Sequence, residues 1–128
     1  TMKERMMNPV CSMTLRRAGE PMVLHPVEVA ERVWSRTVGL LGRDGLDAHS
    51  GMLITRCRSI HTFFMRFNID VAYLDEEYKV IDMAHNLPPG RFSVCRGRGG
   101  RYALELKGGT LEKNGISIGD VWRLHSQT

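Results

Sequence analysis

Most of the chain alternates apolar and polar residues over short stretches that end at glycine, proline or acidic turns. This period of two is that of a β-strand, in which successive side chains point to opposite faces. It predicts strands over residues 22–32, 51–55, 57–66, 69–75, 78–85, 102–107 and 121–124, with a further short strand around 12–16. Residues 69–75 are apolar on both faces, so we expect that strand to be central and buried.

Helical signals are brief. Ser35 can cap a short helix from about residue 36 to 41, which Gly42 can end in a left-handed conformation. Residues 110–114 predict one helical turn closed by Gly115. Six to eight short strands with one or two short helices make a mainly β fold with minor α, a compact antiparallel β-barrel or β-sandwich.

The length of 128 residues is sufficient for one domain with its own core. Residues 1–21 show no clear periodicity and predict a flexible or loosely docked N-terminal lead-in, followed by a single β-rich domain over residues 22–125. The lead-in has no apolar core of the kind found in secretory signals, and no apolar run is long enough to span a bilayer. These features predict a soluble, cytoplasmic protein without a membrane partner.

Arginines gather in one segment of the chain. Arg91, Arg96, Arg98 and Arg101 fall within eleven residues that contain no Asp or Glu, and they account for the whole formal net charge of +4. Such a basic loop can attract an anionic small molecule or an acidic protein surface. The simpler explanation is a solvated, arginine-rich hairpin, because runs of charge are usually solvated faces.

The same segment bears on nucleic-acid binding. Residues 96–101 read Arg-Gly-Arg-Gly-Gly-Arg, which resembles an RNA-binding RGG segment. A single copy, with only Phe92 and Tyr102 nearby to stack on bases, does not favour a nucleic-acid partner.

Residues 60–70 hold three of the four Phe together with a His, an Arg and an Asp. Arg66 and Asp70 flank a predicted bend and could form a charge-assisted pair, which would either lock the strand junction or hold an anion. The structural role is favoured, since charge pairs near a core are common without any site. His61 shares a strand face with Phe63 and Met65, which is typical of a core histidine. An acid–base role would need a carboxylate, for which Glu105 is the best distant candidate.

Three cysteines, Cys11, Cys57 and Cys95, stand at wide spacing and form no disulfide framework or zinc-ribbon pattern. Cys57, His61, His85 and Cys95 could in principle supply four zinc ligands, but their spacing matches no standard site. We therefore predict no metal and no cofactor, and we expect the cysteines to be thiols.

Several segments occur in the order found in one known family. They are Arg32, 39–43 (Gly-Leu-Leu-Gly-Arg), Leu46, 51–54 (Gly-Met-Leu-Ile), 61–70 (His-Thr-Phe-Phe-Met-Arg-Phe-Asn-Ile-Asp), 74–75 (Leu-Asp), Val80, 104–106 (Leu-Glu-Leu), 115–116 (Gly-Ile) and 119–121 (Gly-Asp-Val). From about Val23 to Leu124 the chain resembles the prokaryotic domain of unknown function 192 family, also called the uncharacterised-ACR family. The resemblance implies a compact, mainly antiparallel β fold with a short helix after the first strand, and no established reaction. Asn68 departs from the Thr or Pro expected before Ile69 and Asp70.

Two functions of different classes remain open. The first is a ligand- or partner-binding accessory module with a pocket between the 61–70 junction and the strand that carries Glu105, where the 91–101 loop attracts an anionic group. Its candidate binding residues are His61, Arg66, Asp70, Glu105, Arg96 and Arg98. The alternative is a small enzyme that uses His61, Asp70 and Glu105 for acid–base or hydrolytic chemistry. No G-x-S-x-G or H-E-x-x-H motif is present, so enzyme activity stays undecided.

Overall fold

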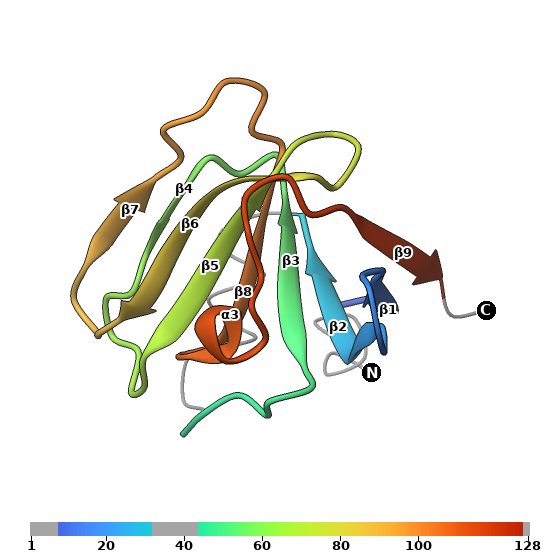
Figure 1. Ribbon diagram of the computed structural model, residues 1–128. Coiled ribbons are helices and arrows are strands. Elements are labelled where there is room, and N and C mark those ends of the chain that lie inside the picture. Colours follow the sequence, from blue (N-terminus) through green and yellow to red (C-terminus); the bar gives the residue numbers. More distant parts are fainter. Residues whose placement is uncertain (1–7, 32–43, 127–128) are drawn as a thin grey trace.

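The computed structural model describes residues 8–31 and 44–126, and this part of the chain is dominated by strands (Figure 1). Its elements are β1 (Val10–Leu15), β2 (Met22–Ala30), β3 (Gly51–Thr55), β4 (Ser59–His61), β5 (Ile69–Leu74), β6 (Val80–Leu87), β7 (Phe92–Val94), β8 (Tyr102–Lys107), α3 (Thr110–Lys113) and β9 (Trp122–Ser126). The predicted mainly β fold with minor α is confirmed. None of the described helices is long and apolar enough to cross a bilayer.

Seven strands form one twisted sheet in the order β6-β5-β8-β3-β2-β1-β9, and β4 pairs with β7 in a second, small sheet. Neighbouring described strands are antiparallel except β2 and β3, which run parallel. The large sheet curls until Lys79 and Val121, beside its two edge strands, form one bridge. The sheet does not close into a barrel, because this bridge joins only one residue pair, whereas β5–β6 and β1–β9 pair along their length.

Each face of the large sheet carries its own apolar cluster. On one face, residues from β1, β2, β8, β9 and α3 pack together, and Leu104 and Trp122 are among the buried members. On the other face, residues from β3, β5 and β8 pack against the small sheet, with Tyr73 fully buried and Ile60 coming from β4. Strand β5 contributes to both clusters and is buried along its whole length, as the apolar pattern of residues 69–75 predicted. Burial of this kind supplies most of the favourable free energy of folding.

Strand β1 overlaps the short strand predicted around residues 12–16, and it lies between β2 and β9 with Met13 and Leu15 fully buried. Residues 10–15 are therefore packed and not loosely docked. Two other strand predictions need correction. The strand predicted for residues 57–66 extends only over Ser59–His61, and β7 was missed inside the basic loop. The helix predicted for residues 36–41 lies outside the described residues.

Candidate functional site

The outer face of the small sheet is the most unusual surface among the described residues. In the β4–β7 register, His61 lies opposite Phe92 and Ser59 lies opposite Val94. Because side chains alternate along a strand, Ile60 and Ser93 point the other way, where Ile60 packs into the core and Ser93 accepts the Tyr73 hydroxyl at 2.8 Å. The outward side of the sheet is therefore lined by His61, Phe92 and Val94.

Rings from the turn after β4 extend this surface. Phe63 stacks on His61 with ring centroids 5.2 Å apart, and it meets Phe92 edge-to-face at 5.5 Å. Phe64 follows it, 86% exposed, while Phe92 and Val94 are 66% and 61% exposed. We call this set, His61, Phe63, Phe64, Phe92 and Val94, the aromatic face. Exposed apolar side chains that gather on neighbouring segments in this way are typical of interaction sites.

Phe64 is also held in an unfavourable backbone conformation. Its φ of 65° lies in the left-handed region, which costs a residue with a Cβ about 1–2 kcal/mol. The neighbouring turn explains why the chain stays there, because the buried Thr62 hydroxyl donates to the Pro88 carbonyl at 2.6 Å and accepts the Arg91 amide at 2.8 Å. Those bonds also end β4 at His61. Strain held this firmly at an exposed aromatic residue points to a functional role for the turn.

Phe64→Gly should therefore fold at least as stably as the wild type. Glycine removes the strain of the left-handed conformation, which is about 1–2 kcal/mol. It also gives the unfolded chain more conformational entropy, which lowers stability by about 0.5–1 kcal/mol. Urea unfolding should show a gain of about 0.5 kcal/mol, whereas Phe64→Ala, which keeps a Cβ, should show none. A loss above 1 kcal/mol in Phe64→Gly would mean that the ring packs as part of the core.

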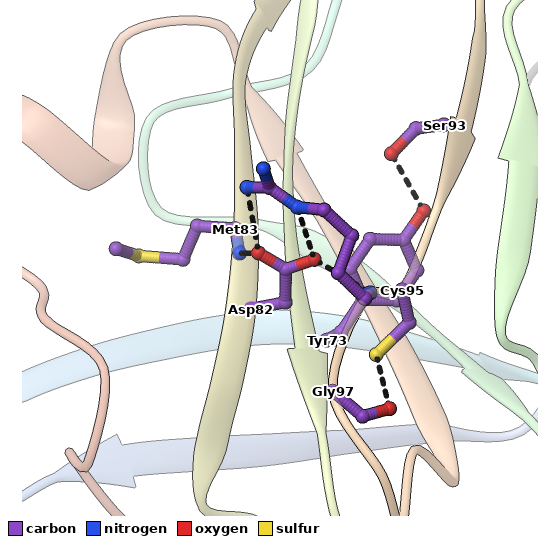
Figure 2. A network of polar contacts seen from close by, with 7 residues as sticks. Tyr73, Asp82, Met83, Ser93, Cys95 and Gly97 are labelled. Atoms are coloured by element: carbon purple, nitrogen blue, oxygen red, sulfur yellow. Dashed lines mark hydrogen bonds and ion pairs between the residues drawn. The ribbon is translucent and has the colours of Figure 1, made fainter.

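The basic loop next to the aromatic face is fixed at its base by Asp82 of β6 (Figure 2). The Asp82 carboxylate accepts hydrogen bonds from the Arg96 backbone amide at 2.9 Å and from the Arg96 guanidinium at 3.3 Å. It also accepts one from the Met83 backbone amide at 2.9 Å. Burial alone would raise the pKa of Asp82, but these bonds outweigh burial and hold the pKa below its usual value. Arg58 reaches the same loop, where its guanidinium donates to the Gly97 carbonyl at 2.9 Å.

A carboxyl whose pKa is lowered on folding makes stability depend on pH. The contribution of Asp82 should be complete above the unfolded-state pKa, about 4, and should disappear as the pH falls through its lower folded pKa. The stability gap between wild type and Asp82→Asn should thus be widest above pH 5 and should narrow below pH 4 in urea unfolding. A gap that is constant from pH 6 to pH 3 would refute this role of the carboxylate.

Asp70, the carboxylate predicted to pair with Arg66, has a different set of partners. It is fully buried and accepts three backbone amides, from Asn86 at 2.7 Å, Gly109 at 3.0 Å and Leu111 at 2.8 Å. It thereby joins the end of β6 to the loop that begins α3. Arg66 instead lies 3.5 Å from Asp44 in an exposed pair. The Arg66–Asp70 pair predicted from the sequence is therefore wrong, and Asp70 instead binds backbone amides of three other segments.

Glu105 is fully buried on the opposite side of the large sheet. In the β5–β8 register Asp70 lies beside Leu106 and Glu105 lies beside Val71, so alternation sends the two carboxylates to opposite faces. Glu105 shares its face with Val71 and Met52, in the cluster that also contains Tyr73. His61 points outward from the small sheet. The large sheet therefore separates two of the three residues proposed for acid–base chemistry, Asp70 and Glu105.

Two buried thiols, Cys57 and Cys95, belong to the same cluster, and Cys11 belongs to the cluster on the other face. Cys57 and Cys95 donate to the carbonyls of Ser59 and Gly97 at 3.0 and 3.7 Å, and burial raises the pKa of the Cys11 thiol. Burial also raises the pKa of Tyr73 to about 12. Across residues 8–31 and 44–126, no group of three His, Cys, Asp or Glu residues is placed to hold a metal ion.

The structure thus divides the predicted site residues. It brings His61 together with Phe63 and Phe92, places Arg96 and Arg98 in the neighbouring loop, and buries Asp70 and Glu105 apart. Sequence reasoning missed Phe64, Phe92 and Val94 as surface residues. A signal for the last two was available, since apolar residues at 92 and 94 alternate with Ser93 inside an otherwise polar loop.

Comparison with known proteins agrees with the sequence motifs. A family model described as an uncharacterised ACR, domain of unknown function 192, matches residues 13–124. The chain is 33% identical to the UPF0127 protein of Pyrococcus horikoshii over 97 residues, covering 73% of this chain and 83% of that protein. It is 40% identical to a UPF0127 protein of Thermococcus sibiricus over 62 residues, which is 48% of this chain and only 39% of the length of that relative.

Two crystal structures resemble the fold. One, of a protein of unknown function from Novosphingobium aromaticivorans, has a TM-score of 0.78 at 21% identity and covers 89% of this chain and 84% of its own. The other, from Sinorhizobium meliloti, is named as a candidate transcription regulator and has a TM-score of 0.79 at 24% identity, covering 92% and 95%. At these identities the likeness concerns the fold alone.

Proposed function

The chain belongs to the uncharacterised ACR family, and from its own surface we propose that it is a partner-binding module. In this proposal the aromatic face docks a segment of another protein that carries apolar side chains flanked by acidic ones. The observation that carries it is Phe64, an aromatic residue that is 86% exposed and held at a φ of 65°. The backbone conformation of Phe64 costs free energy, and its ring buries almost no surface in the monomer. A partner that covers the ring would bury that apolar surface and so offset the cost.

The composition of the surface supports a protein partner. Aromatic residues and arginine are enriched at the centre of protein interfaces, and clusters of exposed rings supply most of the binding free energy there. The rings of Phe63 and Phe92 are already locked against each other, so little side-chain freedom would be lost on binding.

The neighbouring charges indicate an acidic partner. Arg91 precedes Phe92, and Arg96 and Arg98 follow Val94 in a stretch without a carboxylate of its own. The side chain of Arg96 forms an ion pair with Asp82. The other arginines of the loop add positive potential around the aromatic face. Positive charge at the rim of an apolar patch accelerates association with acidic partners and makes the rate depend on salt.

The enzyme alternative receives less support. Acid–base chemistry needs its groups within hydrogen-bonding reach of one substrate. Here Asp70 is occupied by three backbone amides and points to the face opposite Glu105. We therefore do not assign a reaction to His61, Asp70 and Glu105.

The test is site-specific crosslinking in the native host. A photoreactive benzoylphenylalanine replaces Phe64, and in a matched control it replaces Ile118, another exposed apolar residue, in the loop before β9. The proposal predicts a protein crosslink at position 64 that is absent at 118 and lies in an acidic, apolar segment. Equal crosslinking at both positions, or crosslinks at 64 to nucleic acid, would contradict it. The second outcome would instead agree with the name of the Sinorhizobium neighbour.

A further inference from the structure

A groove of about 530 Å³ lies away from the aromatic face, where three segments meet. Its walls are the turn between β1 and β2, residues 48–49 before β3, and the chain that leads from β8 into α3. This volume is within the range of small-molecule sites. None of the site residues predicted from sequence is among its described lining residues.

The groove is rich in positive charge. Arg17 lines it from the turn between β1 and β2, and Lys107 and Lys113 line it from the chain that leads from β8 into α3. Glu20 is the one carboxylate among its described lining residues. His49 also lines the groove. Three permanent cations facing one carboxylate in a concave site favour an anionic occupant, because the walls concentrate their field.

The walls are fixed in place without the lysine side chains. The carboxylate of Asp70 accepts the amides of Gly109 and Leu111, and the Gly108 amide donates to the Asn68 carbonyl at 3.2 Å. Gly108 also permits close packing, because a Cβ there would lie 2.6 Å from Asn86 Oδ1. Lys107 and Lys113 therefore project from a preorganised backbone, which reduces the entropy lost when a ligand binds.

Arg17 joins two of the walls. Its guanidinium donates to the Asn114 carbonyl at the end of α3 and, at 3.4 Å, to the Glu20 carbonyl of its own turn. A guanidinium has five N–H donors, so these two bonds leave capacity for an oxyanion. The amides at the start of α3 are not the source of attraction, since Asp70 already accepts two of them.

We propose that this groove is a binding site for a small polyanion, a molecule with at least two phosphate or carboxylate charges. Lys107 and Lys113 hold the charged groups, Arg17 orients one of them, and Glu20 offsets part of the attraction that these cations exert on an anion. The site lies outside the aromatic face and does not depend on the partner proposed there.

Isothermal titration of the full chain with pyrophosphate and with citrate tests the site, because the two probes separate phosphate from carboxylate recognition. The variant Lys107→Gln/Lys113→Gln should weaken binding of the preferred probe by about a hundredfold, roughly tenfold per charge-assisted contact. The matched control Lys79→Gln/Arg123→Gln removes the same charge elsewhere and should change affinity by less than about threefold, as expected for distant, screened charges. Glu20→Gln should strengthen binding several-fold.

Amide chemical shifts locate the bound probe. The proposal predicts shifts at Gly108, Gly109 and Asn114 on addition of either probe. Absence of measurable binding by both probes, equal losses in the two double variants, or shifts confined to residues 96–98 would each overturn it. Shifts confined to residues 96–98 would place the anion on the basic loop. Absence of binding by both probes would leave the proposal for the aromatic face unaffected.

Discussion

Replacing Asp70 by alanine lowers the free energy of unfolding by about 3–5 kcal/mol, a far larger loss than an exposed carboxylate would cause. The variant leaves three buried backbone amides without the carboxylate that accepts their hydrogen bonds. Two of these amides lie where the chain enters α3. An asparagine at this position keeps one acceptor but turns an NH₂ donor toward amide donors, so Asp70→Asn should lose about 2 kcal/mol. Thermal unfolding should show a fall in Tm of roughly 10–20 °C for Asp70→Ala.

Two controls separate this role from a general effect of charge. Asp75 accepts the amides of Glu77 and Lys79 in an exposed turn, so Asp75→Ala should cost only about 1 kcal/mol. Arg66→Gln should be close to neutral, because its pair with Asp44 is exposed to solvent. If Arg66→Gln proved as damaging as Asp70→Ala, the pair predicted from sequence would be the correct description of this junction.

The second large effect concerns the partner that crosslinking at position 64 identifies. Phe64→Ser/Phe92→Ser should weaken its binding roughly a hundredfold or more, since truncation of a central aromatic residue at an interface costs about 2–4 kcal/mol. Stability should hardly change, because the two rings are 86% and 66% exposed. Titration with the purified partner at two salt concentrations measures both the loss and the contribution of the arginines.

The matched control is Ile118→Ser/Val121→Ser, which removes two exposed apolar side chains outside the aromatic face. It should leave the affinity within about twofold of the wild type, as expected for residues outside an interface. Equal loss in both double variants would show that the partner recognises exposed apolar area in general.

The β-strand elements were largely predictable because their information is local. Residues 69–74 and 102–107 form β5 and β8 almost as their patterns indicate, and burial on both faces of β5 follows from its continuous apolar run. The boundary of β4 was not predictable from its alternation. Thr62 continues the pattern as a strand residue would, but its hydroxyl and backbone bond to residues 88–91, which lie more than twenty positions away.

The pairing of charges depended on topology in the same way. Arg66 and Asp70 stand four residues apart on either side of a bend, and local spacing favours a pair. The amides that satisfy Asp70 come from residues 86, 109 and 111, which only the sheet order brings beside β5. Sequence alone likewise could not show that Asp70 and Glu105 occupy opposite faces, because that depends on the register between β5 and β8.

Amide hydrogen exchange tests the central claim most directly. It is measured on the protein alone and on the protein saturated with the partner that crosslinking identifies. If the aromatic face is the docking surface, protection should rise at residues 59–64 and 91–94 and stay unchanged at residues 107–114 and 117–121. If the partner instead protects the groove beside α3 or the loop before β9, and exchange at residues 59–64 is the same in both states, the aromatic face is not the binding site.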